Sequence, residues 1–171
     1  MNALDRIAEW LGLPPDWRRL DDRTLCRRLR LEGFEHLHAA RAKAPSILWF
    51  GGSRGEPSLA ERVLRLYGGD PQARLSVLPE SVPESPGTQT FIEVPFRDGS
   101  APCSLRLAEQ ALRQGAALLP IFGRRVHGDG LAAFRVVIGE ALLPLGTDAA
   151  SLTRRAVARI ETLERDILSR R

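Results

Sequence analysis

One segment limits the folds open to this chain more than any other: an apolar run, a glycine-rich turn and an amphipathic helix follow directly on one another. The run at residues 46–50 reads Ser-Ile-Leu-Trp-Phe and follows a proline, as in a buried strand. The turn spans residues 51–55, and the apolar residues after it recur at helical spacing until Gly68. This order of strand, turn and helix predicts an α/β protein in which helices cover a sheet.

The rest of the chain continues the alternation of helices and strands. Helices are predicted at residues 34–42 and 104–114, strands at 90–96, 116–122 and 131–138, and an edge strand where Leu29 and Leu31 alternate with arginines. The closing segment carries an apolar stripe that predicts a long helix lying on a sheet face: Leu152, Ala156, Ile160, Leu163 and Ile167. We therefore expect an α/β layered sandwich with a mostly parallel or mixed central sheet flanked by helices.

The length fits one domain. A chain of 171 residues buries enough surface to form a core without disulfides or metals. Residues 1–30 are predicted to form an N-terminal helical segment that packs on the domain, and residues 31–171 the domain itself. The proline-rich stretch at 79–88 is expected to be an exposed loop within that domain, because neither half alone has enough strands for a core.

The chain shows no sign of export or membrane insertion. Its longest apolar run, at residues 115–123, is far shorter than the roughly 20 residues that cross a bilayer. The first residues lack the basic-then-apolar layout of a signal peptide, so we expect a cytoplasmic protein. Cys26 and Cys103 have no metal or redox spacing, so no metal site is predicted.

The formal net charge of +4 raises the question of nucleic acid as a partner. Most of the arginines are dispersed along the chain, with one dense group between residues 18 and 30. A basic face needs aromatic platforms or a recognition helix before it indicates nucleic-acid binding. We therefore do not expect a nucleic-acid partner.

Three loops are candidates for a functional site. Ligands of open α/β sheets gather at the carboxyl ends of the strands, which directs attention to residues 51–57, 97–102 and 123–130. The first loop contains Gly-Gly-Ser-Arg-Gly, which satisfies G-x-S-x-G between a strand and a helix, the context of a nucleophile elbow. Ser53 is therefore a candidate nucleophile. The alternative is a plain turn between strand and helix.

A serine nucleophile needs a base. His127, in the third loop, is the candidate, and Asp98 or Asp129 would orient it. The alternative for His127 is an exposed loop histidine. His36 and His38 fall on the helix predicted before the strand at 46–50, where we expect structural roles.

Arginines on the same loops point to an anionic ligand. Arg54, Arg97, Arg124 and Arg125 are candidates for holding a phosphate or carboxylate, and Gly99 lies on the second loop with Arg97. Solvated loop arginines are the alternative.

Several segments resemble one enzyme family. They are Leu-Glu-Gly-Phe-Glu-His-Leu at 31–37 with the strand at 47–50, Val-Pro-Phe at 94–96, the helix and proline-containing strand at 107–125, and 137–140 with the closing helix. Together they cover about two thirds of the chain, with 94–125 the most specific. They look like the bacterial lipid A biosynthesis acyltransferases, of the lysophospholipid and glycerophosphate acyltransferase superfamily.

The resemblance implies an acyl-chain function with an altered site. Enzymes of that family move an acyl chain from acyl carrier protein or coenzyme A to a hydroxyl, using a histidine and an acidic residue five positions later. Here the histidine position falls at Gly52 and the acidic position at Pro57, with Glu56 beside it. The segment with the acceptor-side arginine and the N-terminal membrane helix also look absent. A general base contributes roughly 10²–10⁴-fold, so histidine-dependent transfer is not expected.

Three hypotheses follow. In the first, the protein has lost transfer and is an accessory protein of a lipid, fatty acid or polyketide-type pathway, binding acyl carrier protein, lipid or another pathway enzyme. In the second, it is an active acyltransferase or thioesterase with Ser53 as nucleophile and His127 as base, needing no cofactor besides an acyl carrier protein or coenzyme A thioester. The third is an unrelated small serine hydrolase, which the short portion before Ser53 disfavours. A homodimer and peripheral contact with the inner membrane are left open.

Overall fold

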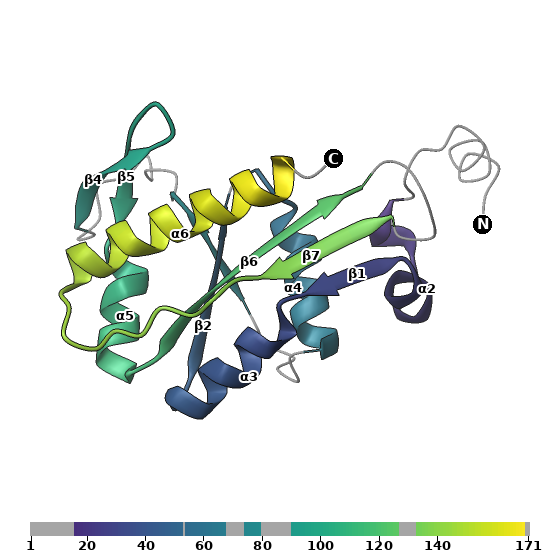
Figure 1. Ribbon diagram of the computed structural model, residues 1–171, viewed down its shortest axis with the longest axis horizontal. Helices are drawn as coiled ribbons and strands as arrows, with labels where there is room; N and C mark the ends of the chain where they lie inside the picture. Colours follow the sequence, from purple (N-terminus) through teal and green to yellow (C-terminus); the bar gives the residue numbers. More distant parts are fainter. Residues whose placement is uncertain (1–15, 53, 68–73, 80–89, 127–132, 170–171) are drawn as a thin grey trace.

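The computed structural model describes residues 16–52, 54–67, 74–79, 90–126 and 133–169 (Figure 1). In chain order its elements are η1 (Trp17–Arg19), α2 (Asp22–Arg27), β1 (Leu29–Glu32), α3 (Phe34–Lys43), β2 (Ile47–Gly52), α4 (Pro57–Tyr67), β3 (Leu75–Leu78), β4 (Phe91–Phe96), β5 (Gly99–Ser104), α5 (Arg106–Gln114), β6 (Ala117–Arg125), β7 (Phe134–Ile138) and α6 (Ala149–Ser169).

The central sheet is mixed and mostly parallel. Its five strands lie in the order β1-β7-β6-β2-β3. β1 pairs parallel with β7, and β6, β2 and β3 are parallel to one another, whereas β6 and β7 are antiparallel. The predicted α/β fold with a mostly parallel or mixed sheet is confirmed.

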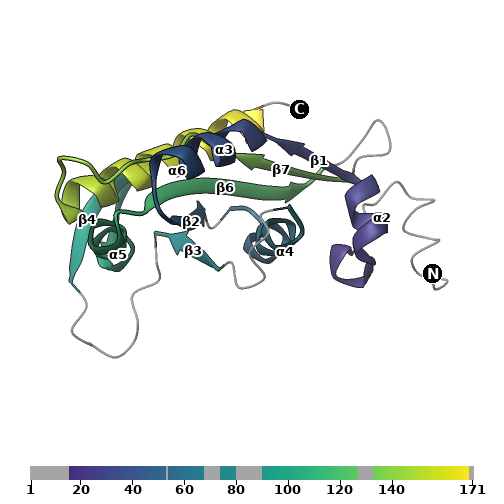
Figure 2. The same ribbon diagram turned by 90° about the horizontal axis from the view of Figure 1, so that it is seen from below.

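Helices cover both faces of this sheet, and Figure 2 shows β6 between α6 and α4. Successive residues of a strand point to opposite faces, and the core is divided accordingly. Trp49 of β2 and Leu119 of β6 belong to one buried cluster with Leu59 of α4. Phe50, which follows Trp49 in β2, and Leu118, which precedes Leu119 in β6, belong to a second buried cluster with residues of α5 and α6.

The predicted closing helix lies on a sheet face as expected. Leu152, Ala156 and Ile160 of α6 are fully buried, and Ile167 is nearly so. The helix contacts β2, β4 and β6. Within the described residues, no helix has both the length and the apolar character that crossing a bilayer requires.

One predicted loop is a hairpin. The sequence predicts a loop at residues 97–102, but β4 pairs antiparallel with β5 to form a separate two-stranded sheet. The prediction was wrong for two physical reasons. Arg97 takes a left-handed conformation at φ 55°, so a turn as short as residues 97–98 suffices. Pro102 lies opposite Glu93 in a two-stranded ribbon, where both strands are edges and a missing N–H is tolerated.

Other boundaries differ less. β2 continues through Gly52, into the predicted turn, and β3 was not predicted. The predicted boundary between the N-terminal segment and the domain, at residue 30, falls inside β1. Trp17 and Leu25 of the N-terminal segment are buried in the core. Residues 1–15 of that segment, and residues 80–88 of the predicted proline-rich loop, lie outside the described residues.

Candidate functional site

The three predicted loops are linked around the carboxyl end of β2. The Glu56 N–H of the β2–α4 turn donates to the Gly123 carbonyl of β6 at 2.6 Å. A Cβ at Gly55 would lie 2.9 Å from the same carbonyl oxygen, so the close approach of turn and strand requires glycine there. The turn between β4 and β5 is connected to α6, because the Arg97 N–H donates a hydrogen bond to Glu161 Oε1 at 2.9 Å.

A buried carboxylate lies over the end of β2. Glu164 of α6 is only 2% exposed, and its Oε1 accepts a hydrogen bond from the Arg54 N–H at 3.3 Å. A Cβ added to Gly52 would overlap with the same Oε1. Position 52 therefore accommodates only glycine while Glu164 keeps this place.

Burial raises the pKa of Glu164 above its ordinary value. The Arg54 N–H and the charges of Arg97 and Arg54 act in the opposite direction, but burial outweighs them. The site therefore holds a carboxyl group that takes up a proton more readily than an exposed one.

Two exposed arginines form the rim of the site. Arg54 follows β2, and Arg97 stands at the hairpin turn with its guanidinium 4.5 Å from the centre of the Phe96 ring. Neither guanidinium makes an ion pair within the described ranges of the chain. The rim can therefore receive an anionic group without breaking an existing pair.

Glu56, a candidate because it stands beside the acidic position of the resemblance, binds Arg125, a candidate for holding a phosphate or carboxylate. Arg125 Nε donates to Glu56 Oε1 at 2.9 Å, and the Trp17 indole N–H donates to Glu56 Oε2 at 2.5 Å. Arg125 also lies 3.7 Å from the Asp16 carboxylate. This network ties η1 to the β2–α4 turn and to β6, so both side chains are engaged in holding the site's frame together.

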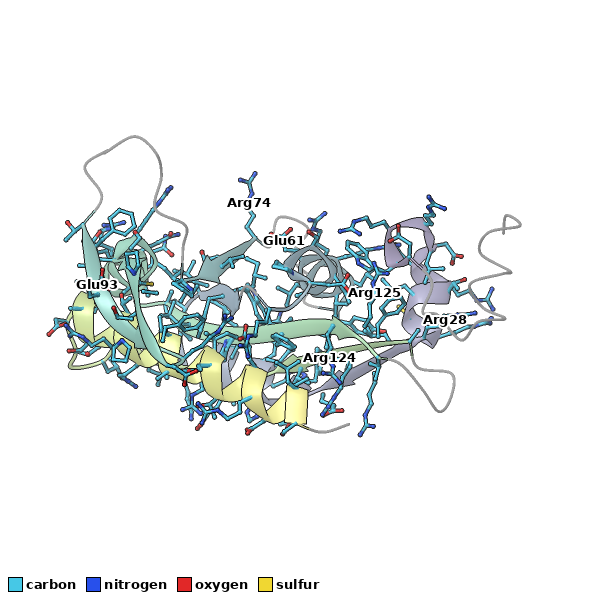
Figure 3. The ribbon with its side chains drawn as sticks, turned by 90° about the horizontal axis from the view of Figure 1, so that it is seen from above. Arg28, Glu61, Arg74, Glu93, Arg124 and Arg125 are labelled. Atoms are coloured by element: carbon cyan, nitrogen blue, oxygen red, sulfur yellow. The ribbon has the colours of Figure 1, made fainter. Side chains whose placement is uncertain are left out.

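The other predicted residues divide into two groups. Arg124 lies on the opposite face of β6 from Arg125, the arginine that binds Glu56 (Figure 3). Asp98 and Gly99 are exposed at the hairpin turn, and Gly99 has open space beside it.

Ser53, His127 and Asp129 lie outside the described residues. The strands that precede them, β2 and β6, are parallel neighbours with Phe50 opposite Pro120, so both strands end toward the same edge of the sheet.

Sequence reasoning missed Glu164, although a signal was present. Glu164 follows Ile160 by four residues and precedes Ile167 by three, so it falls within the apolar stripe of the closing helix. A charged residue at such a position is buried and needs a partner. Here that partner is the Arg54 N–H.

The described residues include neither a metal centre nor an open space beneath α5 and α6. No group of three or more His, Cys, Asp or Glu side chains is placed to hold a metal ion in the described part of the chain. One region between β3, β5, α5, β6 and α6 has essentially no room for a water molecule, and it is lined by Leu78, Ser104, Leu107, Ala108, Leu118, Thr153 and Ala156. This region is therefore too closely packed to hold a long acyl chain.

Comparison with known proteins adds no family. No protein-family model matches the chain, and no curated protein does either. The resemblance to acyltransferases therefore stays a prediction.

Proposed function

We propose that this protein is an accessory component of an acyl-chain pathway, which binds an acyl carrier protein or its thioester without histidine-dependent transfer. The supporting observation is the Glu164 carboxylate over Gly52. In the family that the chain resembles, the base would project from position 52. Here that position has no side chain, and Glu164 fills the space beside it.

The same carboxylate bears on catalysis by Ser53. In a nucleophile elbow, the backbone N–H of the residue after the serine stabilises the oxyanion. In this chain that N–H belongs to Arg54, and it donates to Glu164 Oε1. An ionised carboxylate at this point opposes the negative charge of an oxyanion. Glu164 therefore disfavours both a catalytic base at position 52 and an oxyanion bound by the Arg54 N–H. This supports binding without turnover.

The rim arginines support an anionic partner. Arg54 and Arg97 are exposed, free of ion pairs among the described residues, and both act on Glu164. The phosphodiester that links an acyl group to its carrier is an anion of the kind that guanidinium groups bind. Charges on the rim of an interface also raise the rate of association with a partner of opposite charge.

The second candidate is an active acyltransferase or thioesterase with Ser53 and His127. The observation that favours it is the setting of Gly-Gly-Ser-Arg-Gly, which follows β2 and precedes α4 as the elbow motif requires. For this activity Glu164 has to be protonated or leave the Arg54 N–H, and its raised pKa makes protonation easier.

Binding tests the first proposal. Acyl carrier protein, loaded or unloaded, is titrated by calorimetry into the wild type, the double variant Arg54→Ala/Arg97→Ala and the matched control Arg106→Ala/Arg113→Ala, which removes two exposed arginines of α5. We expect saturable association that weakens about tenfold or more in the first double variant and is unchanged in the control. The proposal is wrong if the wild type binds neither form.

A further inference from the structure

A row of three arginines crosses the sheet away from the site described above. Arg124 of β6 is the register partner of Arg135 of β7, and Arg135 is the partner of Arg30 of β1. Register partners on neighbouring strands project from the same face. Figure 3 shows Arg124 on the face of β6 that carries α6, opposite to Arg125.

One carboxylate lies beside this row. Glu32 accepts from Arg135 through both oxygens, from Nε at 3.0 Å and from Nη2 at 2.8 Å. Its Oε1 also lies 2.7 Å from Arg30 Nε. Arg30 and Arg135 therefore pair with the same carboxylate. Arg124 has no ion pair with any described residue.

Arg124 is also short of a hydrogen-bond acceptor. Its Nε is buried and has no hydrogen-bond partner among the residues that the structure describes. Arg135, directly opposite, has a side chain only 11% exposed. Like charges placed opposite each other on a sheet destabilise it, as does a buried N–H without an acceptor. An anion beside Arg124 would relieve both.

We propose that Arg124 and Arg135 form a binding site for a phosphate group, with Arg30 at its edge. Glu32 engages Nε and Nη2 of Arg135, which leaves Nη1 for a ligand. Planar guanidinium groups bind phosphate oxygens in pairs, and a phosphate presents enough oxygens for two arginines. The phosphate belongs either to a soluble compound or to a lipid headgroup. This site does not depend on the function proposed for the Glu164 site.

The first test uses inorganic phosphate at constant ionic strength, with the arginine Nε–H signals followed by NMR. We expect saturable shifts of the Arg124 and Arg135 signals in the wild type. In Arg124→Gln the affinity read from Arg135 falls about tenfold or more, whereas Arg113→Gln, on α5, binds as the wild type does. The second test measures sedimentation with phosphatidylcholine vesicles that contain or lack phosphatidic acid. If the protein binds phosphatidic acid vesicles but not inorganic phosphate, and Arg124→Gln abolishes the vesicle binding, the phosphate is that of a lipid headgroup.

The stability of Arg124→Gln separates a ligand site from a structural role. Without phosphate, this variant should be at least as stable as the wild type toward urea, because it removes a repulsion and an unpaired donor. Loss of stability would indicate a structural role and overturn the proposal. So would the absence of Arg124-dependent binding in both the phosphate and the vesicle experiments.

Discussion

Position 52 has no side chain, and Glu164 occupies the space that one would fill. These two residues lie in different elements, at the end of β2 and near the end of α6. A buried carboxylate needs a hydrogen-bond donor, and the Arg54 N–H supplies it. At this scale, the glycine, the carboxylate and the amide depend on one another.

The first prediction concerns that dependence. Gly52→Ala should lower the free energy of unfolding by about 1–3 kcal/mol, because the new Cβ overlaps with Glu164 Oε1. In the background of Glu164→Ala the same change should cost less, with a coupling of about 0.5–3 kcal/mol in a double-mutant cycle followed by urea unfolding. Gly99→Ala, at a glycine with open space, is the control. Additive effects of the two substitutions would contradict the contact.

The second prediction concerns the charge of Glu164. Folding raises its pKa, so the folded state holds the proton more tightly than the unfolded chain, whose value lies near 4.5. The wild type therefore loses stability, relative to Glu164→Gln, as the pH rises from 4.5 through the raised pKa. The gain from Glu164→Gln should be larger at neutral pH than below pH 4.5, measured by urea unfolding. Glu93→Gln, on β4, is the control. A gain that does not change with pH would refute the assigned cause.

At the scale of elements, Glu56 holds the turn before α4 in place. Its backbone N–H binds β6, and its carboxylate binds Arg125 of β6 and Trp17 of η1. Its backbone carbonyl also accepts from Leu59 and Ala60 in the first turn of α4. One residue therefore links the start of α4 to β6 and to η1.

The third prediction tests this role. Glu56→Ala should lower the free energy of unfolding by about 1–3 kcal/mol, because it leaves Arg125 and the Trp17 N–H without their main acceptor. Amide hydrogen exchange should increase first in η1 and in the first turn of α4. Glu140→Ala, which removes a surface pair with Arg159 at 3.3 Å, should change stability by less than about 0.5 kcal/mol. Equal losses in the two variants would exclude a special role for Glu56.

The sequence predicted most of these elements because their patterns are local. The apolar run before Gly51 and the stripe of α6 are set by neighbours within one element, and both were confirmed. The β4–β5 hairpin was missed because it depends on Arg97 accepting a left-handed conformation, in which its N–H binds Glu161 of α6. Such a contact between distant segments leaves no periodic pattern in the sequence.

At the scale of the whole molecule, the fold connects the predicted loops to one another, but the candidate side chains on these loops make different interactions. The charges of Arg54 and Arg97 both act on Glu164, whereas Glu56 and Arg125 pair with each other and Arg124 joins a separate row of arginines. The connection of the loops was predictable from the ends of parallel strands. The different roles of these residues were not predictable, because they depend on which face of β6 each arginine occupies and on the Glu164 carboxylate, which lies far along the chain.

The most direct test of binding without transfer is thioester turnover by the saturated complex. The wild type is saturated with acyl carrier protein thioester, and release of the free carrier thiol is followed over time beside Ser53→Ala and a sample without protein. We predict that wild type and variant both release thiol at the rate of the sample without protein, while the carrier stays bound. Repeated turnover by the wild type that is lost in Ser53→Ala would contradict the account and establish the enzyme.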